Sequence, residues 1–142
     1  MFYKKILISV DDGPTAEKVA LKGFHLGQQL KAELALLSVI NTSLLITPDG
    51  ISASEMAEVL NKDFQKCHQM LTDNIFKNHK VWKFIEKGKP VEMILKIAEE
   101  WDADMIVIGT HGRTGINHLL VGSYAESLLH KSKIPVTVIP CK

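Results

Sequence analysis

The spacing of apolar residues changes repeatedly between two periods, and this alternation constrains the fold more than any other feature. Short, nearly continuous apolar runs are typical of buried strands, whereas apolar residues recurring every three or four positions form one face of a helix. The pattern predicts strands at residues 5–10, 34–40, 81–86, 104–108 and 135–140, and helices at 16–30, 56–75, 91–101 and 123–131. The expected order is therefore β-α-β-α-β-α-β-α-β.

Strict alternation of strands and helices predicts an α/β fold, a doubly wound and mainly parallel sheet with helices on both faces. The second expected strand, 34–40 (LALLSVI), is apolar almost throughout, as in strands covered on both sides. Residues 41–54 contain Thr-Pro-Asp-Gly and lack periodicity, so we expect a loop there. All of residues 1–142 are expected to form one domain.

Composition excludes several classes of function. With 142 residues, 46% of them hydrophobic, the chain can bury a core without disulfides or metal. A net charge of +1, without dense runs of Lys or Arg, lacks the footprint of a nucleic-acid binder. No apolar stretch approaches the roughly 20 residues of a membrane helix, and the N-terminus has no signal-peptide pattern. We expect a cytoplasmic protein with no nucleic-acid or membrane partner, in which Cys67 and Cys141 are reduced.

A glycine-rich segment follows the fourth expected strand and leads into a helix. Backbone N–H groups can surround a phosphate only where no Cβ blocks the approach or where the chain adopts positive φ. Ser123 is expected to cap the following helix and to donate to a phosphate oxygen, near a helix N-terminus that favours anions. The spacing indicates phosphate binding, with turn geometry alone as the alternative. The motif is Gly109-Thr110-His111-Gly112, nine residues, then Gly122-Ser123.

The loop after the first expected strand lies next to the glycine-rich segment if the first and fourth strands are neighbours. Ligands of such sheets bind beyond the carboxyl ends of the strands, where the strand order reverses. Asp11 directly follows the first strand. It is either a ligand contact or a turn former or helix cap, which are common roles of Asp in Asp-Gly-Pro segments. His111 and Arg113 are either charge-assisted donors to the ligand or solvated side chains.

No catalytic motif is visible. Neither a Gly-x-Ser-x-Gly elbow nor a Gly-x-x-x-x-Gly-Lys-Ser/Thr loop is present, and the six histidines form no pattern of metal ligands. We expect no catalytic residues and no metal bound by protein side chains.

The whole chain resembles a universal stress protein. The resemblance covers nearly all 142 residues and rests on KILISVDD, LLSVI, the Gly88-x-Pro90 turn, DMIVIGTHGRTG and the closing PVTVI. One branch of that family binds ATP through the pattern Gly-x2-Gly-x9-Gly-Ser/Thr, which this chain matches at every position. The resemblance implies the ATP-binding branch and a sheet of order 3-2-1-4-5.

The resemblance also implies roles for individual residues. Asp11 would lie beside the nucleoside, the Ser9 backbone would line the adenine pocket, and Val39 would contact the base. The run along the ribose and phosphates would be Ile108, Gly109, Thr110, His111, Gly112, Arg113 and Thr114. Gly122, Ser123, Tyr124 and Ala125 would close over the triphosphate, with Mg²⁺ or Mn²⁺ carried by the phosphates.

Two positions depart from the family pattern. Tyr124 replaces a residue that is often small, and its ring either narrows the phosphate site or points outward. His118 stands where Lys or Arg is frequent. This replacement argues against a strongly basic segment that covers the γ-phosphate.

The last strand and the site lead to expectations about assembly and activity. Residues 136–139 are apolar and lie at a sheet edge, where unpaired backbone groups favour strand pairing. The resemblance implies a homodimer through this strand. We expect an ATP-binding sensor in stress adaptation that acts on protein partners yet to be identified. The alternatives are slow ATP hydrolysis, with His111 or Asp11 orienting a water, and binding of AMP or a cyclic adenine nucleotide.

Overall fold

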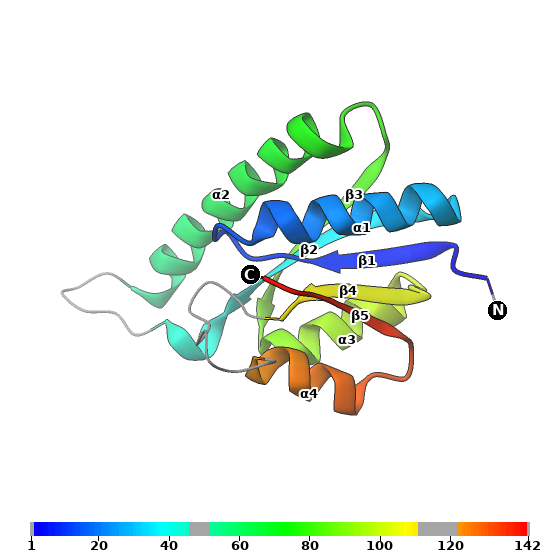
Figure 1. The fold of residues 1–142 in the computed structure, drawn as a ribbon. Helices are drawn as coiled ribbons and strands as arrows, with labels where there is room; N and C mark the ends of the chain where they lie inside the picture. The colour runs from blue at the N-terminus through cyan, green and yellow to red at the C-terminus, as the bar shows by residue number, and fades with distance from the viewer. Residues whose placement is uncertain (1, 46–51, 111–121, 142) are drawn as a thin grey trace.

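The structure is a computed structural model that describes residues 2–45, 52–110 and 122–141. Its elements follow the predicted alternation (Figure 1). The strands are β1 (Lys5–Ser9), β2 (Glu33–Asn41), β3 (Val81–Gly88), β4 (Met105–Gly109) and β5 (Val136–Ile139). The helices are α1 (Ala16–Leu30), α2 (Ala53–Leu71), α3 (Pro90–Glu100) and α4 (Ser123–Lys131), with short helical turns at Thr42–Leu44 and Thr72–Phe76.

The five strands form one parallel sheet in the order β3-β2-β1-β4-β5. Ile8 of β1 is in register with Leu36 of β2 on one side and with Val107 of β4 on the other. The chain builds the sheet outward from β1 to β3, returns to the other side of β1, and continues to β5. The predicted fold class and strand order are confirmed, and the order reverses between β1 and β4.

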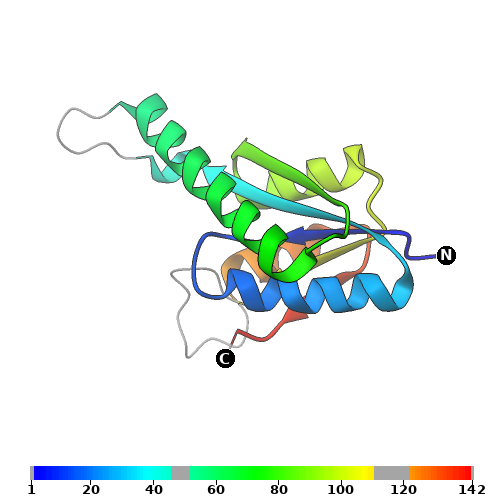
Figure 2. The same cartoon turned by 90° about the horizontal axis from the view of Figure 1, so that it is seen from above.

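The helices cover both faces of the sheet. Helices α1 and α2 lie on one face, and α3 and α4 lie on the other (Figures 1 and 2). Alternate residues of each strand point to opposite faces, so β1 contributes Ile6 and Ile8 to one hydrophobic cluster and Leu7 to the other. Each fully buried aliphatic side chain contributes roughly 1.5–3 kcal/mol, so both clusters hold the strand ends in place.

Two glycines let α1 approach the sheet closely. A Cβ on Gly23 would lie 2.5 Å from Cδ1 of Ile8, and a Cβ on Gly27 would lie 2.5 Å from Cδ2 of Leu34. Only glycine fits this spacing without displacing the core side chains.

The segment 41–54, expected to be a loop, contains more regular structure than predicted. Residues Thr42–Leu44 form a 3₁₀ turn, capped by the Asn41 side chain, which accepts from the Ser43 N–H at 3.1 Å. Helix α2 begins at Ala53, three residues before the first apolar residue of the predicted helix. Ser52 caps it by accepting from the Glu55 N–H at 3.1 Å. The pair Ser52-x-x-Glu55 is a helix-start signal that the apolar spacing alone does not contain.

None of the helices in the described part of the chain is both long enough and apolar enough to cross a membrane.

Candidate functional site

The two ends of the glycine-rich segment meet at the carboxyl end of β4, beside β5. The Thr110 N–H donates to the Ile139 carbonyl at 2.9 Å, and the Gly122 N–H donates to the Thr110 carbonyl at 2.6 Å. The Thr110 hydroxyl accepts from the Cys141 N–H at 3.1 Å. These bonds place Gly109 and Gly122, far apart in the sequence, at one edge of the sheet.

The glycines at this edge are not required by backbone conformation. Gly122 has φ −70° and ψ 164°, an extended conformation open to any residue, and Gly109 lies within β4. Among the described glycines only Gly88 has φ in the left-handed region, at 148°. Backbone conformation therefore does not explain glycine at these two positions, and unobstructed access to backbone N–H groups stays a prediction.

Helix α4 starts at the residue that was expected to cap it. Gly122 occupies the N-cap position, and Ser123 is the first helical residue. The prediction that Ser123 caps the helix is therefore wrong, because its side chain lies beyond the position from which a cap reaches the first-turn N–H groups. Ser123 is exposed, and the N-terminus of α4, the positive end of its dipole, lies at the carboxyl edge of the sheet.

Asp11 lies in the loop that leaves the carboxyl end of β1. Its Oδ1 accepts from the Gly13 N–H at 2.9 Å, which is an Asx turn. Thr15, not Asp11, occupies the N-cap of α1. The alternative role as a turn former is thus confirmed for one carboxylate oxygen. The other oxygen, Oδ2, is buried and has no hydrogen-bond partner within the described residues. A buried carboxylate oxygen needs a donor, so it is suited to accept from a ligand hydroxyl or N–H.

The predicted wall residues lie on the face of the sheet that carries α3 and α4. Ile108 and Ala125 are buried in the cluster on that face, and half-buried Val39 packs against the same cluster. Ser9 follows Leu7 by two residues and so shares its face. The ends of β1, β2 and β4 bring Ser9, Val39 and Ile108 to the carboxyl edge near Asp11, and Ala125 joins them from α4.

Tyr124 reaches across this edge. Its hydroxyl oxygen accepts from Asn41 Nδ2 at 2.8 Å, which joins the first turn of α4 to the end of β2. The Asn41 amide is held in turn by Ser43, whose N–H and hydroxyl donate to Asn41 Oδ1 at 3.1 and 2.6 Å. The ring therefore lies toward β2. Sequence reasoning did not find Asn41, because no motif connects the end of the second strand with the fourth helix.

Four predicted site residues, His111, Gly112, Arg113 and Thr114, lie outside the described residues, as does His118. Their roles remain predictions.

The sequence also gave no reason to single out Ser38 and His68, which lie beside this site. His68 is 1% exposed, and its Nε2 lies 2.8 Å from Ser38 Oγ. Burial, with the nearby Lys83 charge, lowers the pKa of His68 to about 4. Burial, with the carboxylates of Asp12 and Asp11, raises the pKa of the Cys67 thiol, which favours its protonated form.

We expect the lowered pKa of His68 to reduce the free energy of unfolding in acid. The unfolded chain binds this proton below pH 6.5, whereas the folded chain binds it only near pH 4, so acid favours unfolding across that window. The full effect is about 3 kcal/mol, at 1.36 kcal/mol per pKa unit. Urea unfolding followed by circular dichroism at pH 7 and pH 4 measures it, with His68→Leu as the control. Between pH 7 and pH 4, the free energy of unfolding should fall by more in wild type than in His68→Leu. An unchanged difference would contradict the assignment.

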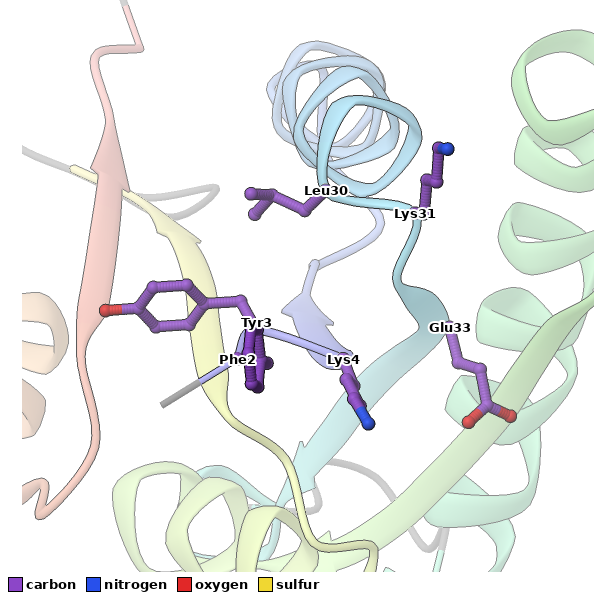
Figure 3. A pocket seen from close by; sticks show the side chains of 6 residues that line it. All are labelled: Phe2, Tyr3, Lys4, Leu30, Lys31 and Glu33. Carbon is purple, nitrogen blue, oxygen red and sulfur yellow. The ribbon is translucent and has the colours of Figure 1, made fainter.

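Two other kinds of site, a metal centre and a small-molecule pocket, have less support. Among the described residues, no group of three or more His, Cys, Asp or Glu side chains is arranged to hold a metal ion. A hollow of about 510 Å³ lies beside the start of β1 and β2, at the opposite edge of the sheet (Figure 3). It is lined by Phe2, Tyr3, Lys4, Leu30, Lys31 and Glu33. These side chains point in different directions, unlike the converging polar groups of small-molecule sites.

The chain is similar to known proteins along its whole length. The model of the universal stress protein family matches residues 2–140. Universal stress protein MJ0577 of Methanocaldococcus jannaschii is 36% identical, over 100% of this chain and 98% of the relative. The solved structure of MJ0577 superposes with a TM-score of 0.84 and 32% identity, covering 100% of this chain and 99% of the other.

Two more distant solved structures share the fold. One is an Archaeoglobus fulgidus universal stress protein in complex with dAMP, with a TM-score of 0.62 and 20% identity, covering 98% of this chain and 99% of the other. The second is a universal stress protein in complex with cAMP, with a TM-score of 0.68 and 15% identity, covering 100% of both chains. With a family model that matches almost every residue and a relative 36% identical over the full chain, this protein belongs to the universal stress protein family.

Proposed function

We propose that residues 1–142 act as one nucleotide-binding domain whose ligand is ATP, bound at the carboxyl ends of β1, β2 and β4. The observation that carries the proposal is the meeting of Gly109 and Gly122-Ser123, the first and last positions of the Gly-x2-Gly-x9-Gly-Ser spacing, near Asp11, whose Oδ2 is buried and lacks a partner among the described residues. A nucleotide supplies the hydroxyl donors that this oxygen lacks and the phosphates that glycine-flanked N–H groups bind.

The proposed orientation follows from the chemistry along the edge. The base lies on the apolar side of the site, against Val39, Ile108 and Ala125, and the ribose hydroxyls donate to Asp11. The phosphates lie toward Gly109, Gly122 and the positive end of α4, whose dipole stabilises an anion by about 0.3–1 kcal/mol. The remaining proposed contacts are Ser9, Thr110, His111, Gly112, Arg113, Thr114, Ser123 and Tyr124. The triphosphate oxygens, rather than protein side chains, would hold Mg²⁺ or Mn²⁺.

The proposed role is that of a cytoplasmic sensor in stress adaptation rather than a fast enzyme. Rapid phosphoryl transfer needs an oriented water and a cation that stabilises the developing charge. In the described part of this edge, Asp11 is the candidate for orienting a water, and one of its oxygens already accepts the hydrogen bond of the Asx turn. Slow ATP hydrolysis is the alternative activity. Binding of AMP or a cyclic nucleotide is a second candidate, favoured by the dAMP and cAMP complexes of the two distant relatives.

Calorimetric titration with ATP, ADP, AMP and cAMP, each with and without Mg²⁺, tests the proposal. We expect the tightest binding for ATP with Mg²⁺. Binding of none of these at millimolar concentration would refute the function. Tighter binding of AMP or cAMP would favour the second candidate, and phosphate release in single-turnover assays would measure any hydrolysis. Mass spectrometry of the purified protein would identify a nucleotide that co-purifies.

We also propose a homodimer that pairs through β5. This strand carries the uncharged sequence VTVI between two prolines, and it bonds to β4 on one side. The opposite edge strand, β3, instead carries Lys83 and Lys87, and edge lysines discourage strand pairing.

Replacing Val138 with proline should convert the dimer to a monomer. The bonds from Ile106 N–H to Pro135 and from Thr110 N–H to Ile139 direct the backbone of odd-numbered β5 residues toward β4. In a parallel ladder the even-numbered residues then direct theirs outward, so proline at 138 removes an outward N–H and leaves the bonds to β4. Light scattering after size exclusion measures the mass, with Val138→Thr as a control that keeps the N–H. A dimeric proline variant would argue against this interface.

A further inference from the structure

Two polar side chains are fully buried in the described part of the chain, and they contact each other beside the proposed site. Ser38 of β2 is 0% exposed and His68 of α2 is 1% exposed, within an otherwise apolar core. Burying polar groups costs free energy unless they are hydrogen-bonded. His68 keeps one buried ring nitrogen, Nδ1, without a partner among the described residues. A leucine would bury no such atom, so core stability alone gives no reason for histidine here.

The direction of the hydrogen bonds is determined by the atoms involved. Ser38 Oγ lies 2.8 Å from the Val10 carbonyl oxygen, which can only accept, so the serine proton points there. Ser38 has one proton, and His68 Nε2 must therefore donate to Ser38 Oγ across 2.8 Å. The result is a chain from α2 through β2 to the peptide group that joins Val10 to Asp11.

The next peptide group is held from the same helix. Cys67 Sγ, adjacent to His68 in sequence, donates to the Asp11 carbonyl at 3.5 Å. The preceding group is held by the sheet, because the Val10 N–H donates to the Leu37 carbonyl at 2.9 Å. Successive backbone groups on both sides of the Asp11 Cα are thus anchored. The Asp11 side chain is then limited by its own bond to Gly13.

We propose that Ser38, His68 and Cys67 are positioning residues of the nucleotide site. They hold the backbone on both sides of Asp11 and thereby aim Asp11 Oδ2, which has no partner among the described residues, at the ligand. The identity of the ligand rests on the proposed function, whereas the positioning itself is a property of the ligand-free chain. Helix α2 is accordingly part of the site although none of its residues is assigned a contact with the nucleotide.

Amide hydrogen exchange by NMR tests the positioning without any nucleotide. The probe is the Gly13 N–H, which Asp11 Oδ1 protects. Ser38→Ala should speed its exchange by about tenfold or more as the loop opens locally, while the Ile106 amide in the sheet stays protected. Ser38→Thr keeps a hydroxyl and should retain most of the protection. Ile75→Val, which removes one methylene from the same core, should leave Gly13 unchanged. Unchanged Gly13 exchange in Ser38→Ala would overturn the proposal.

His68→Leu is a second test variant that should stay folded, because leucine fills the core and needs no hydrogen bond. We expect a folded protein in which Gly13 exchange is faster than in wild type but slower than in Ser38→Ala, because Ser38 keeps its own bond to the Val10 carbonyl. In wild type, the ¹⁵N shifts of His68 should report a neutral ring protonated at Nε2. A ring protonated at Nδ1 instead would contradict the chain of bonds.

A double-mutant cycle with ATP separates positioning from nonspecific destabilisation. Ser38→Ala should weaken ATP affinity by about fivefold in wild type and by less than about 1.5-fold in an Asp11→Ala background, since coupled residues are not additive. Equal losses in both backgrounds would show that Ser38 does not act through Asp11, and would overturn the proposal. If wild type binds no nucleotide, the proposed function fails, and the Gly13 exchange result still decides whether these residues position Asp11.

Discussion

Replacement of Gly122 by valine is expected to abolish nucleotide binding while the protein remains folded. The φ and ψ of Gly122, −70° and 164°, are accessible to valine, so the backbone tolerates the change. The new Cγ atoms would occupy the approach to the first turn of α4. Losing two hydrogen bonds to a charged phosphate, at about 1.5–3 kcal/mol each, amounts to a hundredfold or greater loss of affinity.

A size series makes this test specific. Gly122→Ala should bind more weakly than wild type and more tightly than Gly122→Val, because the obstruction grows with the side chain. Gly122→Ser is the matched control for helix capping, since serine is favoured at an N-cap. Calorimetry gives the affinities, and circular dichroism with thermal unfolding confirms the fold. Wild-type affinity in the valine variant would exclude this edge as the phosphate site.

Asp11 variants should show the second large effect. Asp11→Ala removes both the turn oxygen, which accepts from Gly13, and the buried Oδ2. We expect ATP affinity to fall by about 10- to 100-fold, the equivalent of one charged hydrogen bond of roughly 1.5–3 kcal/mol.

Asp11→Asn separates the two roles of the carboxylate. Asparagine can keep the bond to the Gly13 N–H through its amide oxygen, but it presents an NH₂ donor where the ligand hydroxyl needs an acceptor. The asparagine variant should therefore keep wild-type Gly13 exchange and still lose most of its ATP affinity. If it binds ATP as tightly as wild type, the carboxylate serves the turn and not the nucleoside.

Much of the fold was predictable from local patterns, since strands and helices bury their apolar faces with different periods. The five strands and four helices appear in the expected order, and Gly109 and Gly122 lie on the expected edge. The misplaced features are the starts of two helices. Ser52 starts α2 ahead of its apolar face, and Gly122 rather than Ser123 takes the N-cap of α4. Periodicity cannot locate a helix start to the residue, because the cap lies outside the apolar face of the helix.

Within the candidate site, residues carried by a motif were predictable and residues brought in by packing were not. Asp11 follows a strand directly and belongs to a recognisable opening. Asn41 meets Tyr124 only because β2 and α4 converge at one edge of the sheet. Ser38 and His68 meet because α2 packs over the face of β2 to which the Ser38 side chain points.

By itself the sequence determined the α/β class, the family, and the loops on which a phosphate ligand is proposed to bind, because each depends on spacing along the chain. Tertiary structure alone decided which side chains stand around Asp11 and how its two oxygens are used. Burial makes those choices: inside a packed core a polar atom must find its partner wherever the fold has placed one, and that partner is often distant in sequence.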